Sequence, residues 1–99
     1  MGSRLLLIID PEAQLEIDKA IEWYEKARIG LGKEFFNYLE GYFKTLQQNK
    51  ISFQIKRKPV FRELALKRFP YVIIYEQTKE EIYIYSIFNT HQNPIKKSH

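Results

Sequence analysis

The stretch that decides the fold spans residues 60–94 and reads VFRELALKRFPYVIIYEQTKEEIYIYSIFNTHQNP. Its first part, from Val60 to Arg68, has the period of two that is typical of a half-buried strand. Residues 71–75 and 82–88 are rich in β-branched and aromatic side chains, as strands are. Pro70 occupies the first turn, and residues 77–81 form a connector short enough to make neighbouring strands antiparallel. The stretch therefore predicts a three-stranded meander.

The residues before this meander predict a strand and a helical hairpin. Leu5 to Ile9 is an apolar run consistent with a buried strand. Asp10-Pro11-Glu12 supplies an N-cap carboxylate, a proline at the first helical position and an acid at the positive end of the helix dipole. Gly30 and Gly32 mark a turn, after which a second helix runs to about Gln48. The order strand, helix, helix, strand, strand, strand predicts an α+β fold, in which a two-helix antiparallel hairpin packs on one face of a mainly antiparallel four-stranded sheet and leaves the other face open.

Each predicted helix carries an apolar stripe for the core. In the first helix, Leu15 lies off this stripe and Trp23 lies at its border, so each is either an anchor for a partner protein or part of a broad core face. Phe36 widens the stripe of the second helix. The two stripes consist of Ala13, Ile17, Ala20, Ile21, Tyr24 and Ala27, and of Phe35, Leu39, Tyr42, Phe43 and Leu46.

Length and composition predict one domain, residues 1–99, of a soluble protein of the cytoplasm. The chain has 99 residues and no cysteine, and its longest apolar run is too short to span a bilayer. We set residues 1–3 aside as a cloning remnant or disordered start, and we expect residues 95–99 to form a mobile basic tail. Residues 51–55, inside the connector before the meander, are a candidate for a further short strand.

The net charge of +4 is unevenly distributed along the sequence. Residues 1–55 carry seven basic and eight acidic side chains, whereas residues 56–99 carry nine basic and four acidic ones. Such a basic field attracts nucleic acid or an acidic protein segment, but lysines on an edge strand also serve only to block aggregation. Charge alone leaves both interpretations open. The basic candidates for contact with a macromolecular partner are Lys56, Arg57, Lys58, Lys67, Lys96 and Lys97.

Most catalytic constellations are missing from the sequence. Gly30-Leu31-Gly32 does not have the spacing of a phosphate loop, and neither histidine has a partner at metal-ligand spacing, so we expect no cofactor and no metal ion. One type of catalytic site remains, that of a nuclease, in which cationic side chains hold a phosphodiester and a histidine transfers a proton during its cleavage. Its candidates are Arg62, Arg68, Tyr71 and His91, each of which is equally explained as a strand-end or loop residue.

The order and spacing of four short motifs resemble the RelE/ParE toxin superfamily of type II toxin–antitoxin modules, also known as plasmid stabilisation proteins. The resemblance extends from Leu5 to Pro94 and implies the fold expected above. The motifs are Ala20-Ile-Glu-Trp-Tyr-Glu25, Gly30-Leu-Gly32-x-x-Phe35, Arg62-x-Leu-x-Leu-x-Arg-Phe-Pro-Tyr71-x-Ile-x-Tyr75 and His91-x-Asn-Pro94.

This resemblance implies one of two targets. RelE-like members cut mRNA on the ribosome with cationic residues of the sheet, whereas ParE-like members poison DNA gyrase and have no known nuclease site. Many cleaving relatives carry an arginine in the third strand, where this sequence has Val72, Ile73 and Ile74. The resemblance therefore favours a ParE-like, non-enzymatic inhibitor of gyrase. The alternatives are a RelE-like ribosome-dependent mRNA endonuclease and a non-toxic member that only binds its partner.

The resemblance also implies a protein partner. Antitoxins of this superfamily wrap an extended, often acidic C-terminal segment around the toxin, and the basic half of this chain suits such a segment. We expect a cognate antitoxin, with either a homodimer or a heterotetramer containing the antitoxin as the assembly.

Overall fold

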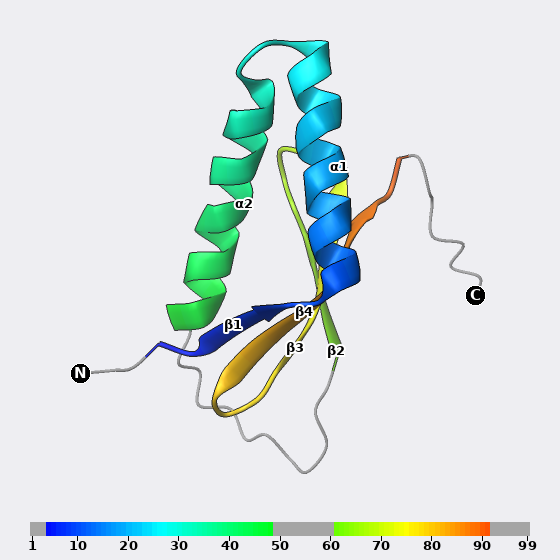
Figure 1. Ribbon diagram of the computed structural model, residues 1–99. Coiled ribbons are helices and arrows are strands. Elements are labelled where there is room, and N and C mark those ends of the chain that lie inside the picture. Colours follow the sequence, from blue (N-terminus) through cyan, green and yellow to red (C-terminus); the bar gives the residue numbers. More distant parts are fainter. Residues whose placement is uncertain (1–3, 49–60, 92–99) are drawn as a thin grey trace.

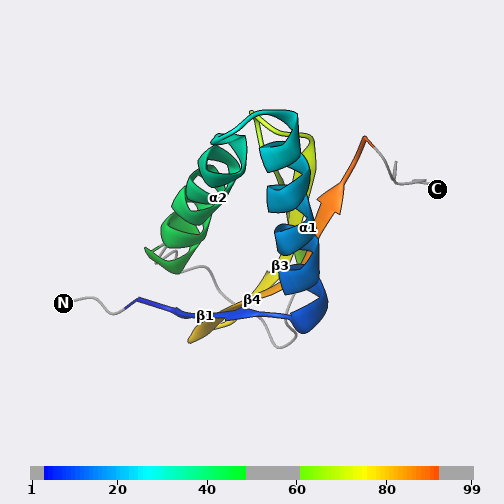
Figure 2. The same cartoon turned by 45° about the horizontal axis from the view of Figure 1, so that its top comes forward.

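Two helices and four strands make up residues 4–48 and 61–91, the part of the chain that the computed structural model describes. Both helices lie on one face of the sheet (Figures 1 and 2). The strand order is β1-β4-β3-β2, and only the β1–β4 pair is parallel, so the predicted α+β fold is confirmed. The elements are β1 (Leu6–Ile9), α1 (Pro11–Ala27), α2 (Leu31–Gln48), β2 (Phe61–Ala65), β3 (Tyr71–Gln77) and β4 (Glu81–Asn89).

The first strand of the meander ends earlier than its sequence pattern predicts. β2 stops at Ala65, because the next residues form the turn into β3: the Leu66 amide donates to the Tyr71 carbonyl at 2.9 Å, and the Tyr71 amide donates to the Phe69 carbonyl at 2.8 Å. Arg68 therefore lies in this turn and not in a strand. The candidate strand at residues 51–55 lies outside the described residues.

Helix α1 starts as its sequence predicts, and its last turn fixes the connection to α2. The Asp10 carboxylate accepts a hydrogen bond from the Glu12 amide at 2.9 Å, which caps the helix. Near the other end, the Glu25 carboxylate accepts from the amides of Gly30, at 2.9 Å, and Gly32, at 3.0 Å. Gly30 has a φ of 91°, a backbone conformation that favours glycine. The hairpin is thus held by one acidic side chain of the first helix.

The core lies between the helices and the sheet. Phe35 of α2 is fully buried and contacts three other aromatic rings, with centroid distances of 5.2 Å to Tyr24, 5.0 Å to Phe69 and 5.3 Å to Tyr71. Ala27, which the stripe of the first helix predicts to be in the core, is exposed because α1 ends there. The buried aliphatic residues that complete this core are Leu66 of the β2–β3 turn and Ile73, Ile82, Ile84 and Ile87 of the sheet.

Two glycines of α2 are expected to respond to alanine in opposite directions. A Cβ atom at Gly32 would lie 2.6 Å from the backbone oxygen of Ile21, so Gly32→Ala must push the helices apart and is expected to cost about 1–3 kcal/mol of unfolding free energy. A Cβ atom at Gly41 would meet nothing within 4 Å. Gly41→Ala is therefore expected to stabilise the protein by about 0.5–1 kcal/mol. Urea denaturation of both variants tests this contrast, and equal effects would contradict it.

Candidate protein interface

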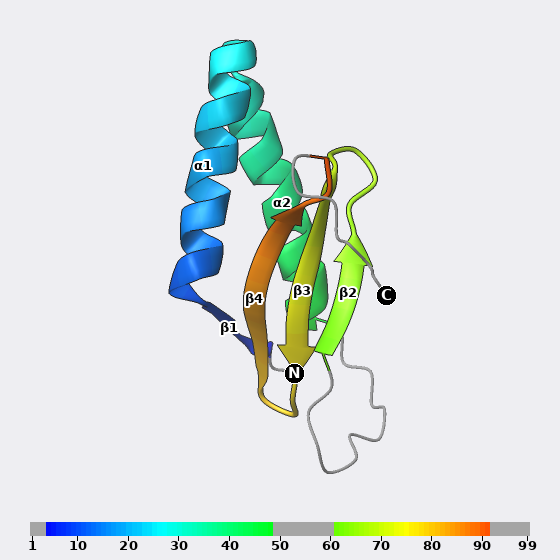
Figure 3. The ribbon, with the colours of Figure 1, turned by 90° about the vertical axis from the view of Figure 1, so that its right-hand side faces the viewer.

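Helix α1 lies beside the second half of β4, where that strand has no strand neighbour on this side (Figure 3). β1 pairs only with residues 81–84 of β4, so residues 85–89 extend beyond it. Between α1 and this part of β4 lies a groove of about 430 Å³, here named the α1–β4 groove. Its lining residues are Glu16, Lys19, Ala20, Trp23, Tyr71, Ile87, Phe88 and Asn89.

Glu16 closes one end of the free edge of β4. Its carboxylate Oε1 accepts a hydrogen bond from the Ile87 amide at 2.8 Å and another from the Ser86 hydroxyl at 2.9 Å. The side chain thus replaces the backbone acceptor that a neighbouring strand would supply. Since Glu16 comes from α1, these bonds also tie the helix to the strand beside the groove.

One side of α1 carries two large apolar side chains that point into solvent. Leu15 is 59% exposed and Trp23 is 58% exposed. Together with Lys19 they repeat every four residues, so they form a single row along the helix, and this row ends at the α1–β4 groove. Tryptophan is among the residues that most often dominate the binding energy of protein interfaces. The geometry of this row suits contact with another protein.

The floor of the α1–β4 groove contains neutral hydrogen-bonding groups. The Asn89 side-chain amide donates to the Tyr71 hydroxyl at 3.1 Å. Burial raises the pKa of Tyr71, and burial together with the neighbouring Tyr71 raises the pKa of Tyr24 to about 12. The Tyr71 hydroxyl and the Asn89 amide are therefore neutral hydrogen-bonding groups in a groove that the charged Glu16 and Lys19 also line.

The raised pKa of Tyr24 predicts a loss of stability in alkali. Because its native-state pKa is about 12 and its ordinary value is 10.0, the folded chain holds this proton more tightly than the unfolded chain. The contribution to stability is complete below pH 10 and is lost as the pH rises toward 12. Tyr24→Phe is expected to reduce the fall in unfolding free energy over this range, as measured by urea denaturation at successive pH values. An equally steep fall in the variant would rule out Tyr24 as a source.

The four residues of the nuclease hypothesis occupy different environments. Arg62 is paired with Tyr75 across β2 and β3, four residues or about 13 Å along the sheet from Tyr71. Tyr71 is buried in the helix–sheet layer, whereas His91 is exposed after β4, and Asn89 hydrogen-bonds both the Tyr71 hydroxyl and the His91 amide. The structure thus brings Tyr71 close to His91 but places Arg62 at the far end of its strand.

Arg68 takes part in a contact between the helical layer and the β2–β3 turn. Its guanidinium lies 2.7 Å from the Glu34 carboxylate of α2, which also lies 3.5 Å from Arg28. The hydrogen bond from Arg68, and the nearby Arg28, lower the pKa of Glu34. Lys67, in the same turn, is exposed. The other basic candidates, Lys56, Arg57, Lys58, Lys96 and Lys97, lie outside the described residues.

The excess positive charge of the chain does not lie on the meander itself. Residues 61–91 carry four basic and four acidic side chains, and the described residues together carry ten basic and twelve acidic ones. Residues 49–60 and 92–99 contain six basic residues and no acidic residue. The folded layers are therefore slightly acidic, and the basic character comes from these two flanking segments.

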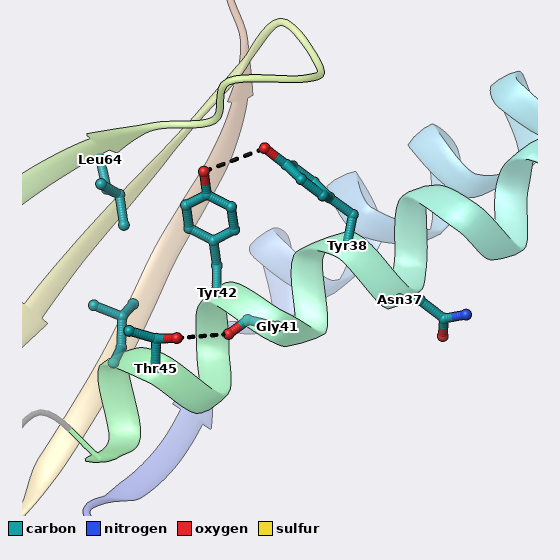
Figure 4. Close-up of a pocket in the computed structure, with 7 residues that line it drawn as sticks. Asn37, Tyr38, Gly41, Tyr42, Thr45 and Leu64 are labelled. Carbon is teal, nitrogen blue, oxygen red and sulfur yellow. Dashed lines mark hydrogen bonds between the residues drawn. The ribbon is translucent and has the colours of Figure 1, made fainter.

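A second groove, which the sequence did not predict, lies between α2 and β2 (Figure 4). It has a volume of about 500 Å³. The hydroxyls of Tyr38 and Tyr42 share a hydrogen bond of 3.2 Å, and the Tyr38 hydroxyl also accepts from the backbone amides of Lys67 and Arg68. These bonds tie α2 to the β2–β3 turn. The groove is lined by Asn37, Tyr38, Gly41, Tyr42, Thr45, Leu46 and Leu64.

Comparison with known proteins agrees with this geometry. The family model of the ParE toxin of the type II toxin–antitoxin system parDE matches residues 7–94. The chain belongs to the ParE toxin family. A ParE-like toxin of this kind is one component of a type II toxin–antitoxin module. The resemblance to the RelE/ParE superfamily, on its ParE-like branch, is thereby confirmed.

A solved structure also has this fold. The chromosomal ParDE toxin–antitoxin system from P. aeruginosa contains a chain that superposes with a TM-score of 0.69 at 21% sequence identity, and the match covers 87% of this chain and 96% of that one. No curated protein matches the sequence significantly.

Two further findings concern the part of the chain that the structure describes. Neither α1 nor α2 is long and apolar enough to cross a membrane. Within residues 4–48 and 61–91 there is also no group of three or more histidine, cysteine or acidic side chains that could hold a metal ion.

Proposed function

We propose that this ParE-family toxin acts by binding DNA gyrase and not by cutting RNA. The observation that carries the proposal is the composition of β3, in which Val72, Ile73 and Ile74 follow the buried Tyr71. A strand without cationic side chains at these positions offers nothing to stabilise the charge that develops on a phosphodiester during cleavage. Inhibition by binding needs only a complementary surface.

A cognate antitoxin neutralises the toxin in this proposal, and it does so on the outer side of α1. The row of Leu15, Lys19 and Trp23 presents apolar anchors beside the α1–β4 groove, as a segment that folds on binding requires. The six basic residues of segments 49–60 and 92–99 favour an acidic antitoxin electrostatically. Apolar anchoring and charge attraction thus come from separate parts of the toxin.

A supercoiling assay with purified gyrase tests the target. The protein is expected to inhibit supercoiling and to accumulate covalent cleavage complexes in proportion to its concentration. The cognate antitoxin, purified and added in equimolar amount, is expected to restore supercoiling. Unchanged gyrase activity at saturating protein, together with cleavage of mRNA on translating ribosomes, would replace this proposal with the endonuclease hypothesis.

A further inference from the structure

The face of the sheet turned away from both helices carries its own distinct set of side chains. Figure 3 views the sheet from this side, with α2 behind it. The strand registers place residues that are directly paired on the same face. The open sheet face defined in this way comprises Leu6, Ile8, Phe61, Glu63, Ala65, Val72, Ile74, Glu76, Glu81, Tyr83, Ser86 and Phe88. Tyr85 has no direct partner in the register, but its ring contacts with Phe61 and Tyr83 place it on the same face.

This face does not have the composition of a sheet surface that only meets water. Antiparallel sheets with one solvated side normally alternate apolar residues toward the core with polar residues toward water. Here β3 turns Val72 and Ile74 outward while Ile73 is fully buried on the other side. Phe61 of β2 is 63% exposed on the same face. Apolar side chains on both faces indicate a sheet whose second face is covered by a partner when the protein acts.

Three aromatic rings on this face form a fixed row. The ring of Tyr85 lies 5.0 Å from that of Phe61 and 4.6 Å from that of Tyr83. The Tyr85 hydroxyl donates to the Glu76 carboxylate at 2.6 Å, and the Tyr83 hydroxyl donates to the Asp10 carboxylate at 2.9 Å. Both rings are therefore held in one orientation, and each hydroxyl is paired with a negative charge. A rigid aromatic surface of this kind loses little side-chain entropy when a partner binds.

All ionisable side chains of the open sheet face, other than its tyrosines, are acidic. They are Glu63, Glu76 and Glu81, and among the described residues no lysine, arginine or histidine shares the face. Carboxylates attract cations, and the faces of aromatic rings add a cation–π attraction for lysine and arginine. The chemistry of this face is thus opposite to that of the basic segments at residues 49–60 and 92–99.

We propose that the open sheet face binds a basic protein surface, and that this surface belongs to the toxin's target. This inference rests on the proposed function, in which the target is gyrase. An enzyme that holds DNA presents clusters of lysine and arginine to the phosphates, and such a cluster complements an aromatic face rimmed with carboxylates. In this proposal the two partners use different surfaces of the toxin: the apolar anchors Leu15 and Trp23 place the antitoxin on the outer side of α1, and the aromatic rings and carboxylates place the target on the open sheet face.

Two variants on β2 test this assignment. Glu63→Lys reverses an exposed charge on the edge strand, and Phe61→Ala removes the outermost ring of the aromatic row. Each is expected to raise the concentration needed for half-inhibition of gyrase supercoiling by about tenfold or more. The control is Asp18→Lys, which makes the same change of charge on the exposed side of α1. The concentration of this variant needed for half-inhibition of gyrase is expected to stay within about twofold of that of the unmodified toxin. Both β2 variants are expected to keep the melting temperature and antitoxin capture of the unmodified protein.

The outcomes of this experiment separate the inference from the function on which it rests. Unchanged inhibition by both β2 variants overturns the inference while leaving gyrase as the target. If the β2 variants lose antitoxin capture but still inhibit gyrase, the open sheet face binds the antitoxin and the inference is wrong. If the variants change oligomeric state, the face binds a second copy of this chain and the inference is likewise wrong. Failure of the unmodified toxin to inhibit gyrase overturns the proposed function and the inference together.

Discussion

Replacing Phe35 with alanine is expected to lower the free energy of unfolding by about 3–5 kcal/mol. The ring is fully buried between α2 and the sheet and contacts Tyr24, Phe69 and Tyr71. Its removal leaves a cavity that these three rings cannot fill, since each is fixed by its own neighbours. A domain of this size has a total stability of about 5–15 kcal/mol, so the loss is a large share of the whole.

Phe36 provides the matched control for this substitution. It is the next residue of the same helix, but its side chain is 37% exposed, so Phe36→Ala is expected to cost about 1 kcal/mol or less. Urea denaturation of both variants, followed by circular dichroism, gives the two free energies directly. Equal losses for Phe35 and Phe36 would show that burial in this core is not what stabilises the fold.

Replacing Trp23 with alanine is expected to weaken antitoxin binding by about 30-fold or more, the usual loss at an interface hot spot. The exposed ring borders the α1–β4 groove, and Leu15 and Lys19 continue its row along α1. A partner that covers this row buries most of the indole, which contributes more apolar area than any other side chain on the helix surface. The stability of the toxin alone is expected to change little, because the ring is already largely in solvent.

Titration calorimetry with the purified antitoxin measures this loss. Ile29 is the control, since it is an almost fully exposed apolar residue of the turn between the helices and lies outside the α1–β4 groove. Ile29→Ala is expected to leave the affinity within about twofold. If Trp23→Ala binds as tightly as the unmodified toxin, the antitoxin does not use this side of α1.

The fold could be predicted from the sequence because its signals are local. The Asp10-Pro11 start of α1, the glycines around residue 30 and the β-branched runs of β3 and β4 each specify their element without reference to the rest of the chain. The end of β2 was less predictable. Leu66 and Phe69 continue an apolar pattern, but their side chains reach the core from a turn and not from a strand.

The candidate interface could be predicted only in part. Helical spacing placed Leu15 off the core stripe and Trp23 at its border but left open whether they belong to a broad core face, and in the structure both are exposed. The α1–β4 groove depends on where β1 stops relative to β4 and on the irregular pairing near Ile74 and Tyr75, which are properties of strand register. The position of Arg62 and the acidic character of the open sheet face also depend on strand register, because a shift of one residue moves every side chain of a strand to the opposite face.

The parallel pairing of β1 with β4 joins residues 6–9 to residues 81–84, so the first of the described strands pairs with the last of them. Three fully or almost fully buried isoleucines, at positions 82, 84 and 87, belong to that last strand. A nascent chain interrupted before residue 81 therefore lacks both the partner of its first strand and a main part of its core. A fragment that ends before β4 is therefore expected not to fold, and the surfaces proposed above for the antitoxin and the target form only when β4 is present.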